Sequence, residues 1–190
     1  MNKTTTLSAY VLPASLPVGL IAAVLGSLVL ALSAKIQVPF WPVPMTLQSL
    51  AIITIGMAFG MKLATFTVLL YLGEGLVGIP VFAGAGAGPA YLMGPTAGYL
   101  AGFVMAAAFC GWMAERGWDR HWLKALAALT IGHLLMFIPG VAWLATLMGL
   151  EKAMAVGFTP FVAATVLKTL LAAALLQAAW KLVKKVRHSS

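Results

Sequence analysis

The sequence predicts an all-α membrane protein in which about six helices cross the bilayer. Of its 190 residues 62% are apolar, and only 12 basic and 4 acidic residues are present. A soluble domain of this length cannot bury so much apolar surface. Because one span takes roughly 20 apolar residues, six spans and their short links fill the chain. We therefore expect residues 1–190 to form a single transmembrane domain.

The first three spans are expected at 17–34, 45–61 and 63–76. Pro17 suits a first helical position, where its missing N–H has no intrahelical partner to lose. Residues 35–44 hold three prolines, which cannot continue a helix. This proline-rich link is long enough to fold back over the protein.

A glycine-rich link follows at 78–96 and is the least helical stretch of the chain. Non-helical backbone at membrane depth is tolerated where protein buries it or a cavity hydrates it. Glycines such as Gly84 and Gly86 let the backbone come close to a ligand. A flexible outer loop is the alternative, and the sequence alone does not decide between the two.

The last three spans are expected at 97–114, 123–150 and 161–183, with a kink at Pro139 and Gly140. An even number of spans places both termini on one side of the cell (inner) membrane. Short cytoplasmic links carry an excess of lysine and arginine, so the basic residues near span ends assign that side to the cytoplasm. These residues are Lys3, Lys62, Arg116, Arg120, Lys124, Lys181, Lys184, Lys185 and Arg187.

The net charge of +8 raises the possibility of a nucleic-acid partner. However, the basic tail at 181–187 directly follows an apolar run and has no interleaved aromatic residues. We therefore expect the lipid bilayer, and no nucleic acid, to be the partner of these charges.

Four residues within the expected spans, Lys168, Glu74, His133 and Gln48, are candidates for function, because an ionisable group costs at least roughly 2.5 kcal/mol at mid-depth. Lys168 lies about two turns into the last span, which is deep for a side chain that reaches the interface. A structural ion pair with Glu74 is the alternative to a ligand contact. His133 is interpreted first as a neutral imidazole bonded to a neighbouring helix, and Gln48 as either a helix cap or a ligand contact.

Catalytic and metal-binding side chains are scarce, because the chain has four carboxylates and one cysteine. We expect no catalytic residue, no metal and no cofactor, and the phosphate-binding GxxxxGK[ST] pattern is missing. A cavity that captures a small, weakly polar solute from outside fits best. The runner-up is an intramembrane enzyme that uses His133 and Glu74 as acid–base residues, and a membrane assembly factor is third.

Several segments resemble one known family. They read AKIQVPFWPVPMTLQ at 34–48, LYLGEG at 70–75, GIPVFAG at 78–84, GPTAGY at 94–99 and AERGWDR at 114–120. Together they are similar to the BioY family, the biotin-specific substrate-capture (S) components of energy-coupling factor (ECF) transporters. The proline-rich segment is the most specific of them.

The resemblance implies a six-helix, ECF S-component-like bundle that binds biotin from outside. It also implies a membrane coupling protein and ATPase subunits as partners. In the family an acid and, three residues later, a lysine on the sixth helix contact the ligand. Here the lysine matches Lys168, while the acid position holds Thr165. Many relatives carry an arginine in the glycine-rich link, and residues 84–88 have none.

Biotin offers a ureido group, an apolar bicyclic body and a carboxylate tail. Lys168 suits either the carboxylate or the ureido oxygen, and Gln48 and Thr165 offer neutral hydrogen bonds. Aromatic residues suit the walls, although each also fits an interfacial belt or helix packing. The substrate-binding residues predicted in this way are Lys168, Gln48, Thr165, Glu74, Tyr91, Tyr99, Trp143, Gly84 and Gly86.

The first span contains a pair of small residues four apart, Ala22 and Gly26. Such pairs let helix backbones approach closely. The resemblance suggests that this face meets the coupling protein, and packing within the chain is the alternative.

Overall fold

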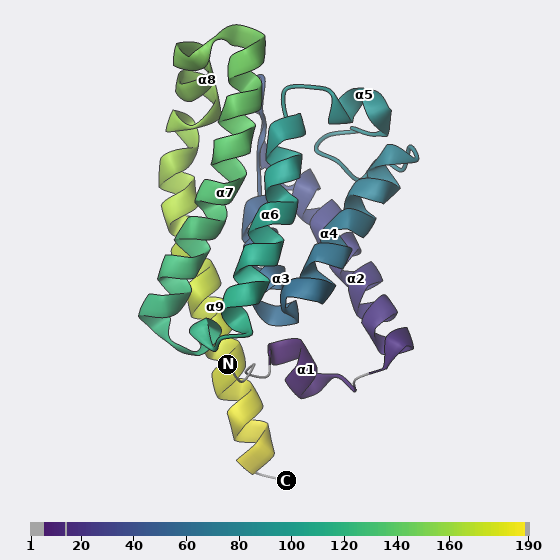
Figure 1. Cartoon of the computed structure of the whole chain (residues 1–190), viewed down its shortest axis with the longest axis vertical. Coiled ribbons are helices and arrows are strands. Elements are labelled where there is room, and N and C mark those ends of the chain that lie inside the picture. Colours follow the sequence, from purple (N-terminus) through teal and green to yellow (C-terminus); the bar gives the residue numbers. More distant parts are fainter. Residues whose placement is uncertain (1–5, 14, 189–190) are drawn as a thin grey trace.

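The computed structural model describes residues 6–13 and 15–188, and most of these are helical (Figure 1). The longest non-helical stretches are 36–47 and 77–87, and the first contains a short antiparallel hairpin in which Gln37 pairs with Thr46 and Val38 with Met45. The elements in chain order are α1 (Leu7–Val11), α2 (Leu16–Lys35), β1 (Gln37–Val38), β2 (Met45–Thr46), α3 (Gln48–Phe59), α4 (Met61–Leu76), α5 (Gly88–Leu92), α6 (Ala97–Ala114), η1 (Trp118–Arg120), α7 (Trp122–Met148), α8 (Leu150–Gly157), η2 (Thr159–Phe161) and α9 (Val162–His188).

Helix α6 is the centre of the bundle and packs against α3, α4 and α7. Its closest approach is to α7, where glycines replace larger side chains. A Cβ on Gly102 would lie 2.7 Å from the Cα of Met136, and one on Gly98 would collide with the carbonyl of Pro139. Small residues at such crossings allow apolar helices to pack tightly without a polar interface. Helix α9 closes the bundle against α7 and α3, and α2 closes it against α4.

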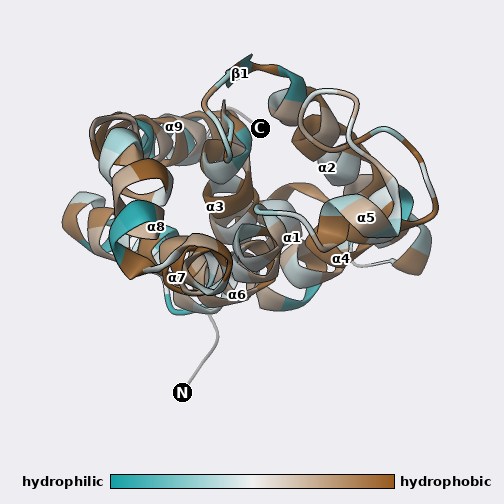
Figure 2. Ribbon diagram, turned by 90° about the horizontal axis from the view of Figure 1, so that it is seen from above, coloured by the Kyte–Doolittle hydropathy of each residue, from teal (hydrophilic) through white to brown (hydrophobic). Residues whose placement is uncertain are grey.

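Brown, apolar residues predominate along the helices in Figure 2. Large apolar side chains are exposed along α2 and α9, including Leu25, Leu28, Leu167 and Leu171. Among the described residues, four segments are long and apolar enough to cross a membrane: Leu16–Lys35, Ala97–Ala114, Trp122–Met148 and Leu150–Val186. The protein is therefore an all-helical membrane protein, and Gln48–Phe59 is a further, shorter apolar helix.

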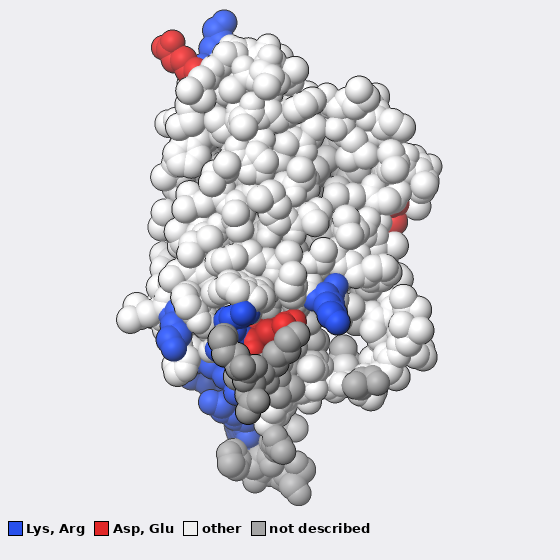
Figure 3. Space-filling model, in the orientation of Figure 1, with Lys and Arg blue, Asp and Glu red and all other residues white. Residues whose placement is uncertain are grey.

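Figure 3 shows most charged side chains at the two ends of the molecule, and on this face the broad band between them is uncharged except for one acidic patch at its edge. Helix α8 carries the exposed Glu151 and Lys152 at one end. The opposite end holds α1, the α6–α7 connection and the C-terminal part of α9 (Figure 1). Of the nine basic residues predicted to share a side, Lys3 and the side chain of Arg187 lie outside the described part of the structure.

Three predicted boundaries were wrong, each because of a local backbone feature. Met45 and Thr46 pair as a strand, so the second long helix begins at Gln48. Gly149, with φ of 84°, ends α7, and a separate short helix occupies most of the expected link at 151–160. Residues 88–92 of the glycine-rich link form α5.

The small-residue pair on the first span packs inside the chain. Ala22 and Gly26 are buried, and a Cβ on Gly26 would lie 2.6 Å from Thr67 on α4. The expectation that this face meets a coupling protein was therefore wrong. The close approach that the pair permits serves the α2–α4 contact instead.

Candidate functional site

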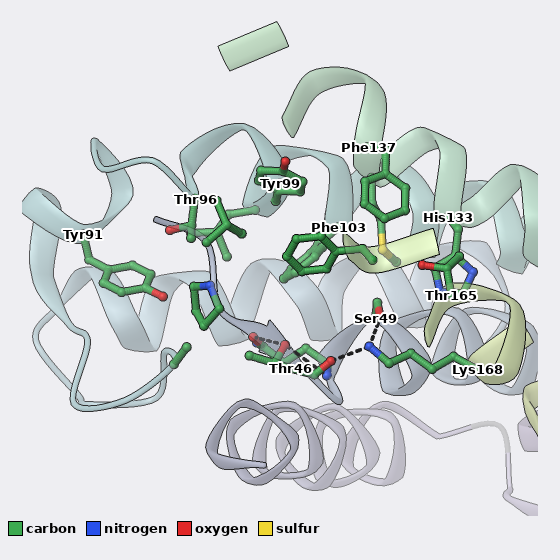
Figure 4. Close-up of a pocket in the computed structure, with 17 residues that line it drawn as sticks. Thr46, Ser49, Tyr91, Thr96, Tyr99, Phe103, His133, Phe137, Thr165 and Lys168 are labelled. Atoms are coloured by element: carbon green, nitrogen blue, oxygen red, sulfur yellow. Dashed lines mark hydrogen bonds between the residues drawn. The ribbon is translucent and has the colours of Figure 1, made fainter. Parts of the chain in front are cut away.

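An inner pocket of ≈70 Å³ lies between α3, α6, α7 and α9, beneath the proline-rich and glycine-rich links (Figure 4). Lys168, Thr165 and His133 lie at one end of it, and Tyr91 and Thr96 at the other. Its lining is Val43, Pro44, Thr46, Gln48, Ser49, Ala83, Tyr91, Thr96, Tyr99, Leu100, Phe103, His133, Met136, Phe137, Phe161, Thr165 and Lys168.

Lys168 brings a half-buried ammonium group to this pocket. Its Nζ donates to the carbonyl of Thr46 at 2.6 Å and to Ser49 Oγ at 3.1 Å. The β2 strand and the first turn of α3 position both acceptors, because the hairpin places the Thr46 carbonyl at the helix entrance. An ammonium carries three donors, so one remains for a ligand.

The ion pair between Lys168 and Glu74 considered from the sequence does not form. Glu74 Oε1 instead accepts a hydrogen bond of 2.9 Å from Ser27 on α2. Among the described residues that line the inner pocket, Lys168 is the one with a fixed charge. Its desolvation is offset by a backbone carbonyl and a hydroxyl rather than by a carboxylate.

His133 on α7 places a buried imidazole nitrogen beside Lys168. The Thr169 hydroxyl lies 2.8 Å from the Thr165 carbonyl and 3.0 Å from His133 Nδ1. Which atom carries the proton in the contact with Nδ1 depends on the tautomer of the imidazole. Nε2 is buried and has no hydrogen-bond partner among the described residues.

Gln48 connects the pocket wall to the glycine-rich link and does not cap its helix. Its Nε2 donates to the Tyr71 hydroxyl at 2.7 Å, and that hydroxyl donates to the Val81 carbonyl at 3.1 Å. Gln48 is 4% exposed and Tyr71 is fully buried. A buried chain of this kind rigidifies the groups it joins.

A larger outer pocket of ≈450 Å³ adjoins the inner one and shares Pro44, Ala83, Tyr91 and Thr96 with it. It lies between the proline-rich and glycine-rich links. Its remaining lining residues are Gln37, Pro39, Phe40, Pro42, Gly84, Ala90, Gly94 and Pro95.

Phe82 lies behind Tyr91, which lines both pockets, and Lys35 holds this part of the glycine-rich link. The Phe82 ring stacks on Tyr91 at 4.7 Å and fits over Gly75, where a Cβ would collide with it. Lys35 Nζ donates to the carbonyls of Pro80, Phe82 and Gly84 at 2.6–2.7 Å. These three bonds use all three ammonium donors.

The structure gathers five of the nine predicted site residues around the inner pocket: Lys168, Gln48, Thr165, Tyr91 and Tyr99. Gly84 lines the outer pocket, and Gly86 lies close against the Tyr91 ring. Glu74 and Trp143 lie outside both linings, where Trp143 Nε1 donates to the Gly94 carbonyl at 2.9 Å.

Sequence reasoning missed Thr46, Ser49 and the aromatic wall of Phe103, Phe137 and Phe161. Helical spacing contained part of the signal. Phe103 follows Tyr99 by four residues and Phe137 follows His133 by four, so each pair shares a helix face. Ser49 carried no comparable signal, because only the fold brings it to Lys168.

Comparison with known proteins supports one family. The BioY family model matches residues 4–185. The biotin transporter BioY2 of Lactococcus lactis is 36% identical over 77% of this chain and 81% of its own length. The biotin transporter BioY of Thermotoga maritima is 35% identical over 81% and 90%, and a probable biotin transporter BioY of Pyrococcus horikoshii is 38% identical over 73% and 81%.

The fold also matches a solved structure, the S component for biotin from an ECF-type ABC transporter. The TM-score is 0.76 at 22% identity, covering 86% of this chain and 90% of that one. This likeness concerns the fold, whereas the family model and the sequence identities extend over most of the chain. On that evidence the chain belongs to the BioY family.

Proposed function

We propose that this chain is the biotin-capture component of an ECF-type vitamin transporter. The observation that carries the proposal is the inner pocket, in which polar groups converge at one end of an otherwise apolar and aromatic lining. Small-molecule sites have this character, with a few placed polar groups for orientation and apolar walls for contact area. The names of the relatives, all biotin transporters, support biotin as the solute.

Biotin binding to the full chain in detergent tests the proposal directly. Calorimetric titration should give saturable binding of one biotin per chain, with thiamine and riboflavin as control vitamins that give no signal. A folded, monodisperse preparation that binds no biotin would refute the proposal.

We propose Lys168, Thr165, Gln48, Tyr91 and Tyr99 as the direct ligand contacts, because they line the inner pocket. The other predicted residues act indirectly in this proposal. Gly84 and Gly86 give the pocket wall its shape, Trp143 holds the Gly94 carbonyl, and Glu74 joins α4 to α2.

The membrane arrangement forms a second part of the proposal. Residues 1–190 would form one transmembrane domain of six spans, made by α2, α3, α4, α6, α7 and α9. The basic end would face the cytoplasm with both termini, and the α8 end would face outward. The pocket, which lies beneath the two links, would then open to the outside of the cell.

Cysteine labelling checks this orientation. A cysteine at Lys152 should react with an impermeant thiol reagent added to intact cells, and one at Lys184 should not. The native Cys110 is fully buried and gives little background. The opposite labelling pattern would reverse the topology.

We further propose that uptake requires an ECF coupling protein and ATPase subunits, as the family resemblance implies. Co-expression with such subunits should yield a complex that co-purifies and accumulates biotin at the expense of ATP. Equal ATP-dependent accumulation by cells lacking those subunits would contradict this part.

The enzyme considered as runner-up has little support in the geometry. His133 lines the inner pocket and bonds to Thr169, whereas Glu74 bonds to Ser27 on the far side of α4 from that pocket's lining. A general acid and a general base must both lie within hydrogen-bond distance of the reacting atoms of one substrate. These two residues do not share a site.

A further inference from the structure

The end of the molecule opposite α8, here called the basic end, has many more basic than acidic side chains (Figure 3). Its acidic residues are Glu115 and Asp119, and both are turned toward the chain itself. Glu115 Oε1 accepts a hydrogen bond of 3.0 Å from the amide of Met61, and Asp119 is fully buried. The basic residues with described side chains at this end are Lys62, Arg116, Arg120, Lys124, Lys181, Lys184 and Lys185.

The lysines of the basic end, rather than its arginines, are available to an outside partner. Arg116 lies 3.5 Å from the centroid of the Trp112 ring, and Arg120 lies over Trp180 at 4.5 Å. An exposed ammonium without a counter-ion in the chain attracts anionic groups from its surroundings. Four exposed lysines form no hydrogen bond or ion pair with another described residue: Lys62, Lys124, Lys181 and Lys184.

The apolar outer face of α9 continues past the bundle into this basic segment. Among the described side chains of α9, Trp180 is the last that is buried. Beyond it, Leu182 and Val186 are 64% and 69% exposed, and they share one helix face because they lie four residues apart. With the exposed Leu171 and Leu175 they form one apolar face, here called the α9 stripe.

Lysines adjoin the end of the α9 stripe, because Lys181 precedes Leu182 and Lys185 precedes Val186. This combination suits the boundary between acyl chains and headgroups. A lysine stem lies along apolar surface there, while the ammonium reaches the polar layer. A soluble partner that neutralised only the lysines would leave the adjoining leucine and valine in water.

Tryptophans place the basic end at the level of the lipid headgroups. Trp112 and Trp122 are exposed near the ends of α6 and α7 that meet the charged connection, and tryptophan is enriched at membrane–water interfaces. Trp180 bonds to Asp119 of the same connection. Lys181 and Lys184 follow Trp180 within roughly 6 Å along the helix, at about 1.5 Å per residue.

We propose that the basic end is a binding surface for anionic phospholipids, in which the lysines near the end of α9 hold headgroup phosphates and the α9 stripe contacts acyl chains. Basic residues next to a membrane span attract anionic lipid, each by about fivefold in affinity. This surface is separate from the proposed biotin site, because none of its lysines lines either pocket.

Titration of the full chain in neutral detergent with phosphatidylglycerol or phosphatidylcholine, at equal acyl chains, tests the proposal. Native mass spectrometry counts the lipids bound to each protein molecule. We expect phosphatidylglycerol to bind at least about tenfold more tightly, and this preference to shrink when the salt is raised, because salt screens exposed charges. Equal binding of the two lipids at low salt would overturn the proposal.

The double variant Lys181→Gln/Lys184→Gln identifies the lysines responsible. Its affinity for phosphatidylglycerol should fall about twenty-fivefold, at about fivefold per lysine, while phosphatidylcholine binding stays the same. The matched control Lys152→Gln, on the exposed surface of α8 at the other end, should change neither lipid. An unchanged affinity in the double variant, or a comparable loss in the control, would contradict the assignment. The salt dependence of the unmodified chain tests the proposal independently of how the variants fold.

Two further measurements separate a membrane from a soluble anion as the partner. Leu182→Ser shortens the α9 stripe and should weaken both lipids by the same factor, about two- to fivefold. Glycerol 3-phosphate and hexaglutamate, which carry the charge without acyl chains, should not displace phosphatidylglycerol at matched ionic strength. Displacement by either one, or no effect of Leu182→Ser, would show that the basic end binds soluble anions instead.

Discussion

The two halves of α9 each contribute to a cluster of buried polar groups, and the two clusters are completed differently. In the N-terminal half, Lys168 and the Thr165–Thr169 pair lie beside the inner pocket, with one ammonium donor left over and His133 Nε2 without a partner among the described residues. In the C-terminal half, Trp180 and Gln177 bind Asp119 of the α6–α7 connection. Because both clusters involve residues of the same helix, the main difference between them is what surrounds each one.

In the Asp119 cluster the chain supplies donors to Oδ2 and to the backbone carbonyl, while Oδ1 is buried without a hydrogen-bond partner among the described residues. Trp180 Nε1 donates to Asp119 Oδ2 at 2.8 Å, and Gln177 Nε2 donates to the Asp119 carbonyl at 3.0 Å. The Trp180 ring also contacts Tyr10 of α1 edge-on and lies 4.5 Å beneath the Arg120 guanidinium. This cluster joins α1, η1 and α9.

Both clusters therefore contain a buried polar atom without a partner, and what differs is whether a pocket adjoins it. His133 lines the inner pocket, whereas Asp119 lines neither the inner nor the outer pocket. Burial costs free energy at both ends, because each group leaves water. Only at the inner pocket can a solute complete the hydrogen bonds. Substitutions at one end should therefore change affinity, and those at the other should change stability.

The largest effect is expected for Lys168→Met at the pocket end. Charge-assisted hydrogen bonds are worth about 1.5–3 kcal/mol, so biotin affinity should fall about ten- to a hundredfold. Lys168→Arg should also lose affinity, since the planar guanidinium group of arginine does not fit a site that holds the compact ammonium group of lysine. Titration calorimetry measures the biotin affinity of both variants. An unchanged affinity in a folded Lys168→Met protein would show that Lys168 has a structural role and does not contact the ligand.

A smaller loss is expected for His133→Phe. The substitution keeps a similar side-chain volume but removes the unpartnered Nε2 of a residue that lines the inner pocket, which should weaken biotin binding by about five- to twentyfold. The matched control Phe137→Leu changes the same pocket wall without a polar group. If both variants lose affinity equally, His133 acts through packing alone and the two ends of α9 differ less than we infer.

At the opposite end, Trp180→Phe should change stability and leave biotin affinity unaltered. It leaves Asp119 Oδ2 buried without its donor, at a cost of about 1–3 kcal/mol. The melting temperature in detergent should fall by several degrees, at about 2–4 °C per kcal/mol. A loss of biotin affinity without a change in melting temperature would contradict the division between the two ends.

The smallest effect is expected from pH. Burial raises the pKa of Asp119 from its ordinary 3.8 to about 6. Between these values the folded protein binds a proton that the unfolded chain does not, so stability should fall as pH rises from about 4 to 6. The melting temperature should therefore be higher at pH 5 than at pH 7, and Asp119→Asn should flatten that dependence. An equal slope in the variant would assign the effect to other groups.

Helix composition and most helix ends could be predicted from the sequence. The central α6 was predicted with the bounds that the structure has, 97–114, because a Gly-Pro pair precedes it and a charged segment follows it. The ends of α2 and α4 were predicted within about two residues for the same reason, since proline and glycine act locally. Family membership was also encoded locally, in the proline-rich segment at 34–48.

The site could be predicted only in part. Lys168 stood out because an ammonium in an apolar run has a high desolvation cost wherever the helix packs. Its partners Thr46 and Ser49 lie about 120 residues away in the chain and carry no pattern that names them. Glu74, predicted from the same reasoning as Lys168, bonds to Ser27 because α4 turns it toward α2.

By itself, the sequence determined that this protein resides in a membrane, where its helices run and to which family it belongs. These properties depend on composition and on short segments, which act without knowledge of distant residues. The tertiary structure alone decided that Lys168 faces a carbonyl rather than Glu74, and that the buried Nε2 of His133 has no hydrogen-bond partner among the described residues. The physical reason is that desolvation is a property of one residue, whereas the hydrogen bonds that offset it need two groups brought together by the packing of separate helices.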